Sequence, residues 1–96
     1  MALTEGLNMA HVLAKLTGVK LADVKQQLEK DAADHAEQGM VLEHLWHNAE
    51  DPSEVLFLFR VKDLEHCRQL TRKVHEQARQ DNPDMPLPDM TFLDGV

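Results

Sequence analysis

The chain has a single cysteine and no long apolar run. Cys67 stands alone, which excludes an internal disulfide, and a lone thiol is typical of a reducing compartment. Residues 1–8 lack the basic region and apolar core of a signal peptide, and we predict a loose leader there. No stretch approaches the roughly 20 apolar residues that span a membrane. These absences predict a soluble, cytoplasmic protein.

Clusters of positive charge are also missing. The formal net charge is -7, and the lysine and arginine residues are scattered among acidic ones. Because binding to phosphates needs grouped positive charge, this composition argues against nucleic acid and against an anionic membrane surface as partners. Solubility is a sufficient explanation for the excess of acidic residues.

Motifs for metal, nucleotide or covalent chemistry are absent from the sequence. The six histidines show no HExxH and no two-Cys, two-His spacing, which are the patterns of zinc sites. His44 and His47 are three residues apart, which places them on opposite faces of a strand and opposes joint ligation. The glycines are isolated, so no glycine-rich loop can hold a phosphate. We predict no metal and no cofactor.

The chain does contain the material for one small domain. Its 96 residues, 43% of them hydrophobic, are enough for a single globular core, so we interpret residues 1–96 as one domain. Aromatic residues are few, and all lie on or near predicted strands, which suggests that they anchor this core. They are Trp46, Phe57, Phe59 and Phe92.

A β-hairpin forms the centre of the predicted fold. Residues 40–47 and 54–61 are predicted strands, and residues 48–53 between them favour turns. The second strand is apolar on both alternations until Arg60, so we expect both of its faces to be buried. The acidic residues of this region, Glu43 among them, are interpreted as a solvated hairpin end.

Two amphipathic helices flank the hairpin. Apolar residues at spacings of three and four predict a helix from about residue 20 to residue 38, which Gly39 ends. Asp63 is a good N-cap for a second helix, whose buried stripe includes Cys67 and Val74 and which ends at Asn82.

Residues 9–17 and 89–94 are predicted as the first and last strands. The resulting order, β-α-β-β-α-β, is that of the ferredoxin-like sandwich, an α+β fold with antiparallel sheet order 4-1-3-2. Right-handed crossovers place both helices on one face of the sheet.

Several segments resemble small dimeric α/β-barrel proteins, which are related in fold to the antibiotic-biosynthesis-monooxygenase-like superfamily. The similar segments are His47 to Val55, Phe57-Leu58-Phe59, Val61-Lys62-Asp63-Leu64 and Pro88 to Leu93. The resemblance covers most of the chain from Gly39 onward and implies a homodimer in which two sheets face each other. That superfamily includes cofactor-free monooxygenases, haem-degrading enzymes and isomerases, but no catalytic motif of these proteins matches here.

The residues support a dimer independently of this resemblance. Helices can cover only one face of the sheet, and the other face is predicted to carry several leucines, which are too apolar to leave in water. A partner subunit is the simplest cover. These leucines are Leu13, Leu56, Leu58 and Leu93.

The same face supplies candidate ligand-binding residues. His11 and Lys15 share one face of the first strand, and Arg60 shares a face with Leu56 and Leu58. His44 and Trp46 share a face with Leu42, although which face of that strand meets the partner stays open. Such residues can line a cavity for a small acidic or aromatic molecule. The candidates are His11, Lys15, His44, Trp46 and Arg60.

Several functions remain open at this stage. The charged candidates can instead reach solvent from strand ends, with Trp46 in the core. A small dimeric barrel that binds an organic acid or aromatic ligand is the first hypothesis. A cofactor-independent monooxygenase or isomerase is the second, since histidine can act as acid or base near neutral pH. A purely structural module is the third, and no residue is assigned a catalytic role.

Overall fold

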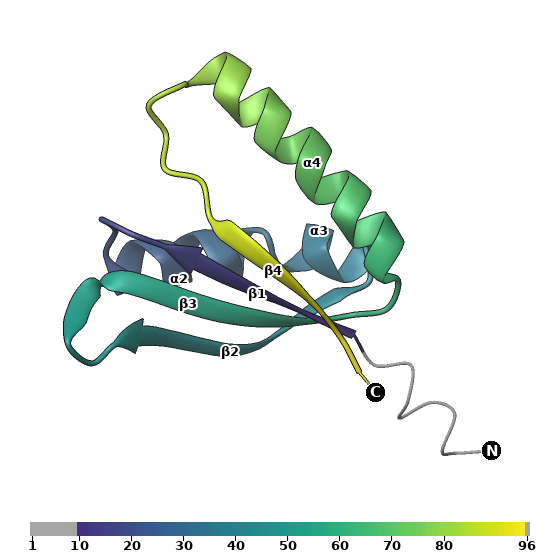
Figure 1. Cartoon of the computed structure of the whole chain (residues 1–96), viewed down its shortest axis with the longest axis horizontal. Coiled ribbons are helices and arrows are strands. Elements are labelled where there is room, and N and C mark those ends of the chain that lie inside the picture. The colour runs from purple at the N-terminus through teal and green to yellow at the C-terminus, as the bar shows by residue number, and fades with distance from the viewer. Residues whose placement is uncertain (1–9, 96) are drawn as a thin grey trace.

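The computed structural model describes residues 10–95, which form a four-stranded antiparallel sheet and three helices (Figure 1). The predicted leader, residues 1–8, lies outside this range. In chain order, the elements are β1 (Ala10–Leu16), α2 (Leu21–Lys30), α3 (Ala32–Glu37), β2 (Met40–Asn48), β3 (Asp51–Val61), α4 (Leu64–Asp81) and β4 (Asp89–Asp94). Among these residues, no helix is both long enough and apolar enough to cross a membrane.

The strand order is β2-β3-β1-β4, which is the predicted order read from the opposite edge. β1 and β3 are therefore central and β2 and β4 are the edges. All three neighbouring pairs are antiparallel. The α+β class and the strand order are confirmed, and both are compatible with a ferredoxin-like sandwich.

The core lies between the sheet and the helices. Alternate residues of β1 and β3 are buried, and Val12 and Val55 are fully inaccessible. From the helices, Val24, Leu28 and Cys67 pack against this layer. Burying one aliphatic or aromatic side chain of this size stabilises the fold by about 1.5–3 kcal/mol. The period-two alternation of the central strands thus fixes which sheet face the helices cover.

The predicted first helix is in fact two helices. α2 ends at Lys30 and α3 begins at Ala32, because Asp31 leaves helical geometry with ψ at 1°. Gly39 then ends α3 with a φ of 78°, as predicted. A Cβ at Gly39 would also lie 3.1 Å from the Cβ of Lys62, so both the backbone angle and the space favour glycine.

Asp63 caps α4, as predicted. The backbone N–H of His66 donates a hydrogen bond of 3.1 Å to Asp63 Oδ1. Cys67, in the next turn, is 1% exposed and belongs to the core. Burial raises the pKa of its thiol, and a hydrogen bond with Thr71 partly opposes this effect. The thiol is therefore a small packing residue.

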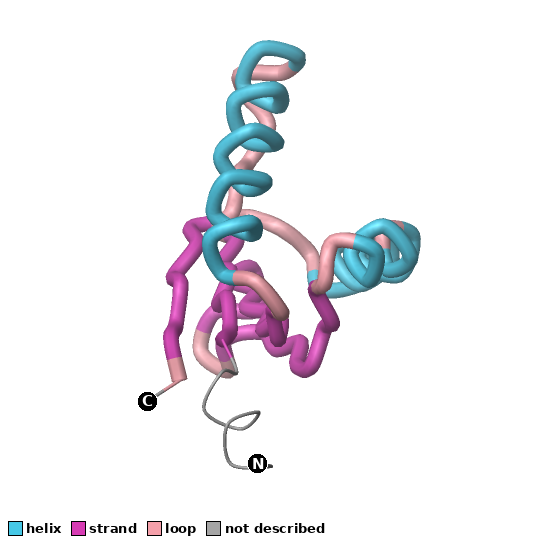
Figure 2. Tube along the Cα trace, turned by 90° about the vertical axis from the view of Figure 1, so that its right-hand side faces the viewer, coloured by secondary structure: helices cyan, strands magenta, loops and turns pink. Residues whose placement is uncertain are grey.

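The second half of α4 departs from the sheet. Figures 1 and 2 show the helix leading away from the strands and from α2 and α3. Val74, predicted to be buried, is 55% exposed, so that part of the prediction is wrong. The physical reason is length, because a helix of 18 residues spans about 27 Å and only its first turns meet the core.

The hairpin strands are longer than predicted. β2 extends to Asn48 and β3 begins at Asp51, so only two residues, Ala49 and Glu50, connect them. Asn48 Oδ1 accepts a hydrogen bond of 2.9 Å from the backbone N–H of Glu50. This side chain holds the turn, which leaves residues 51–53 free to join the strand.

Candidate functional site

The sheet face turned away from the helices, which we call the open face, is lined with half-buried leucines. Leu13 of β1 and Leu58 of β3 are cross-strand partners at its centre. Both alternate with fully buried residues of the same strands, so they point away from the core. The predicted position of Leu58 on this face is therefore confirmed.

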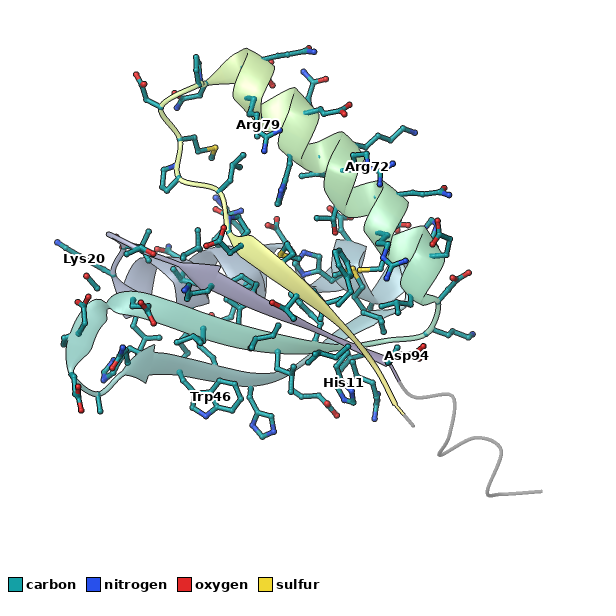
Figure 3. The ribbon with its side chains drawn as sticks, in the orientation of Figure 1. His11, Lys20, Trp46, Arg72, Arg79 and Asp94 are labelled. Atoms are coloured by element: carbon teal, nitrogen blue, oxygen red, sulfur yellow. The ribbon has the colours of Figure 1, made fainter. Side chains whose placement is uncertain are left out.

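All five predicted candidate residues lie on the open face. His11 pairs with Arg60, and Lys15 pairs with Leu56, whose other neighbour is Trp46. His44 pairs with Leu58. Figure 3 shows His11 and Trp46 on the side of the sheet opposite α4. His44 and Trp46 therefore share the face of His11 and Arg60.

A β-bulge in β2 changes one part of this prediction. Leu42 pairs with Phe59, whereas His44 pairs with Leu58, so Glu43 is an extra residue without a cross-strand partner. Leu42 consequently lies on the helix side with Phe59. The predicted shared face of Leu42, His44 and Trp46 is wrong for Leu42, because the bulge reverses the alternation at Glu43.

Glu43 joins His11 and Arg60 in one polar cluster. His11 Nε2 lies 2.9 Å from Glu43 Oε1, and since a carboxylate only accepts, the ring nitrogen is the donor. Arg60 Nη1 lies 3.7 Å from Glu43 Oε2. The side chains of His11 and Glu43 are 26% and 29% exposed. We refer to these three residues as the His11 cluster.

Glu43 is the site residue that sequence reasoning missed. The sequence indicates a residue of a solvated hairpin end, and Glu43 is indeed exposed, but its side chain also connects β1, β2 and β3 through its contacts with His11 and Arg60. A strict alternation along residues 40–47 would place Glu43 and His44 on opposite faces. No local signal in the sequence marks the bulge that allows both to reach the open face.

His44 and Trp46 form a stacked aromatic pair beside the cluster. Their ring centroids lie 4.9 Å apart and the rings are inclined by 11°. Trp46 is 45% exposed, so its predicted role as a core anchor is wrong for a single chain. The pair presents a flat aromatic surface next to Leu56 and Leu58.

Lys15 lies apart from the His11 cluster. It is four residues along β1 from His11, a separation of about 13 Å in a strand. Its cross-strand neighbour on β4 is Asp89. One carboxylate therefore cannot contact both Lys15 and His11, and the structure divides the predicted set into a charged cluster, an aromatic pair and a separate lysine.

A recess between α4 and β4 has a different character from the open face. Its lining includes Arg68, Arg72, His75 and Phe92. The Arg68 guanidinium carbon lies 5.4 Å from the centroid of the Phe92 ring, a cation–π distance. Burial lowers the pKa of His75, and the positive charge of Arg79 lowers it further.

Metal-ligating side chains do not cluster in residues 10–95. Within this range, no group of three or more His, Cys, Asp or Glu side chains could hold a metal ion. Comparisons with protein-family models, with curated proteins and with solved structures found no match. The geometry of the open face is therefore the basis of the functional argument.

Proposed function

We propose that the open face is the floor of a binding site for a small organic acid, completed when a second copy of the chain covers it. The observation that carries this proposal is the arrangement of one charged cluster and one aromatic pair within an otherwise apolar surface. Such a combination, mainly apolar with a few polar groups, is typical of small-molecule sites. The proposed protein is a small dimeric α/β barrel acting in the cytoplasm.

The exposed apolar surface supports a second copy as the cover. Val41, Trp46 and Leu93 are 46%, 45% and 40% exposed, and all three lie on the open face by their strand pairing. They continue the half-buried layer of Leu13 and Leu58. An extended apolar surface of this kind marks an interaction site, and a self-complementary two-fold contact is the commonest solution.

Arg60 and the aromatic pair supply complementary parts of ligand recognition. A guanidinium matches a carboxylate with two parallel hydrogen bonds, and His11 offers a further donor beside it. The His44–Trp46 surface suits an aromatic ring, which gains from offset stacking. An aromatic carboxylate therefore fits the open face better than a purely aliphatic or a cationic molecule.

Acid–base catalysis is the second candidate, and the His11–Glu43 contact favours it. A carboxylate that accepts from one imidazole nitrogen orients the ring so that the other nitrogen can take a proton from a substrate. In this interpretation the protein is a cofactor-independent monooxygenase or isomerase. Glu43 would then be a positioning residue, and His11 the general base.

Sedimentation and calorimetry test the first candidate. We expect the wild-type chain to sediment as a dimer and to bind benzoate, with benzamide as the uncharged control. The double variant His11→Ala, Arg60→Ala is expected to lose benzoate binding and remain dimeric, whereas Lys15→Ala retains binding. If no acid binds the wild type, or if the double variant binds equally well, the proposal is wrong.

A further inference from the structure

Glu43 already contacts His11 and Arg60, the two side chains that the proposed ligand needs. One carboxylate oxygen contacts the His11 imidazole and the other contacts the Arg60 guanidinium, so a carboxylate is held between these two side chains before any ligand arrives. Within residues 10–95, no other acidic side chain forms an ion pair with Arg60. The geometry of Glu43 is thus that of a bound acid tethered to the chain.

The β-bulge is the reason that this carboxylate reaches the cluster. Leu42 and His44 keep their pairing with consecutive residues of β3, and Glu43 is the inserted residue between them. Bulges re-aim side chains and occur often beside functional sites. A regular β2 would place either Glu43 or His44 on the open face, but not both.

We propose that Glu43 is an internal competitor, which a carboxylate ligand must displace from Arg60 and His11 in order to bind. This inference rests on the proposed ligand-binding function and names the residue that sets the affinity and selectivity of that site. Displacement begins at Arg60, because its 3.7 Å contact is longer than the 2.7–2.9 Å typical of charge-assisted hydrogen bonds.

The covalent link of Glu43 to the chain determines which acids can displace its carboxylate from Arg60 and His11. A group linked by a short segment competes as though it were present at about millimolar concentration or above. Acetate offers only its carboxylate, so it gains nothing over Glu43. Benzoate adds contact between its ring and His44 or Leu58, which are cross-strand partners, so it can displace Glu43 where acetate cannot. Glu43 therefore selects acids that carry an apolar or aromatic group.

The decisive variant is Glu43→Gln, which keeps the shape of the side chain and removes its charge. We expect benzoate to bind this variant about tenfold more tightly than it binds the wild type, since a charge-assisted contact no longer opposes it. We also expect acetate to bind the variant measurably. A merely structural role for Glu43 predicts the opposite, namely weaker binding through a disordered site.

The measurement uses the full chain and two readouts. Isothermal titration with benzoate, acetate and benzamide gives the affinities. Trp46 is the only tryptophan and stacks on His44, so its fluorescence reports changes at the aromatic pair of the open face. Adding Arg60→Gln to Glu43→Gln should abolish the gain in affinity.

Glu54→Gln is the matched control. Glu54 lies near the start of β3, and its carboxylate accepts a 3.4 Å hydrogen bond from Asn48 Nδ2. Its substitution removes the same charge from the neighbouring strand of the hairpin without freeing His11 or Arg60. We expect benzoate affinity to be unchanged in this variant, and a gain equal to that of Glu43→Gln would overturn the inference in favour of a general effect of net charge.

The outcomes separate the inference from the proposed function. Tighter binding by Glu43→Gln than by the wild type and the control supports the inference. Equal or weaker binding by Glu43→Gln, with wild-type binding intact, overturns the inference and leaves the proposed function standing. If neither the wild type nor Glu43→Gln binds a carboxylate, both are wrong.

Discussion

The two faces of the sheet are built from the same strands and differ in how completely one chain covers them. On the helix side, Val12, Phe57 and Phe59 are buried beneath α2, α3 and the start of α4. On the open face, their neighbours Leu13 and Leu58 are only half-buried, and charged side chains lie among them. The helix side therefore stabilises the single chain, while the open face is the surface for which we propose ligand and partner contacts.

The largest effect is expected from breaking the helix side. Phe59 is 3% exposed and contacts Phe57 edge-on with ring centroids 5.7 Å apart. Phe59→Ala should lower the free energy of unfolding by about 3–5 kcal/mol, because it removes buried surface and leaves a cavity. Chemical denaturation measures the change. Val41→Ala, at an exposed position of the open face, is the comparison, and a loss as large as that of Phe59→Ala would contradict the difference between the faces.

The next effect concerns the open face alone. Leu58→Glu would place a charge within the proposed apolar dimer contact, at a cost of several kcal/mol. We expect sedimentation to show a monomer or an unfolded chain. Gln26→Glu, on the exposed surface of α2, adds the same charge elsewhere and should remain dimeric. A Leu58→Glu chain that forms a dimer of normal stability would remove this face as the contact.

A smaller effect is expected at the start of α4, which closes the helix side. Asp63→Ala removes the side-chain acceptor for the His66 N–H and should lower the free energy of unfolding by about 1 kcal/mol. Asp84→Ala, in the link before β4, removes one negative charge without removing a cap. Equal denaturation midpoints and slopes for Asp63→Ala and the wild type would show that the cap contributes nothing.

The smallest effect concerns protonation in the α4–β4 recess. Burial is the larger cause of the lowered pKa of His75, and Arg79 is the smaller one. Arg79→Gln should therefore raise the pKa of His75 only part of the way to its ordinary value, as an NMR titration can measure. Lys73→Gln removes one positive charge from an exposed position of α4 and is the control. A pKa that does not move in Arg79→Gln would leave burial as the sole cause.

The lowered pKa of His75 also predicts the direction in which the stability of the fold changes with pH. Because folded His75 resists protonation, the unfolded chain binds the proton more readily as the pH falls through the ordinary histidine value of about 6.5. Acidification through that range should therefore reduce the stability of the wild type. His75→Gln should show a smaller reduction in denaturation experiments at matched pH values.

The sequence by itself determined the elements and most of their faces. Period-two alternation in residues 10–16 and 54–61 assigned His11, Lys15 and Arg60 to the open face, and the structure agrees. Asp63 and Gly39 fixed helix ends through backbone chemistry that acts within a few residues. Such features are local, so they can be read from the chain without knowing what packs against it.

Tertiary structure alone decided the content of the candidate site. Register is a property of two paired strands, and a single inserted residue reverses every side chain beyond it. The pairing of β2 with β3 absorbs Glu43 as that residue, which brings its carboxylate to His11 and Arg60 and turns Leu42 to the helix side. The path of α4 away from the sheet also depends on tertiary structure. An apolar stripe on a helix indicates which side chains favour burial, but it does not indicate whether another surface lies opposite them.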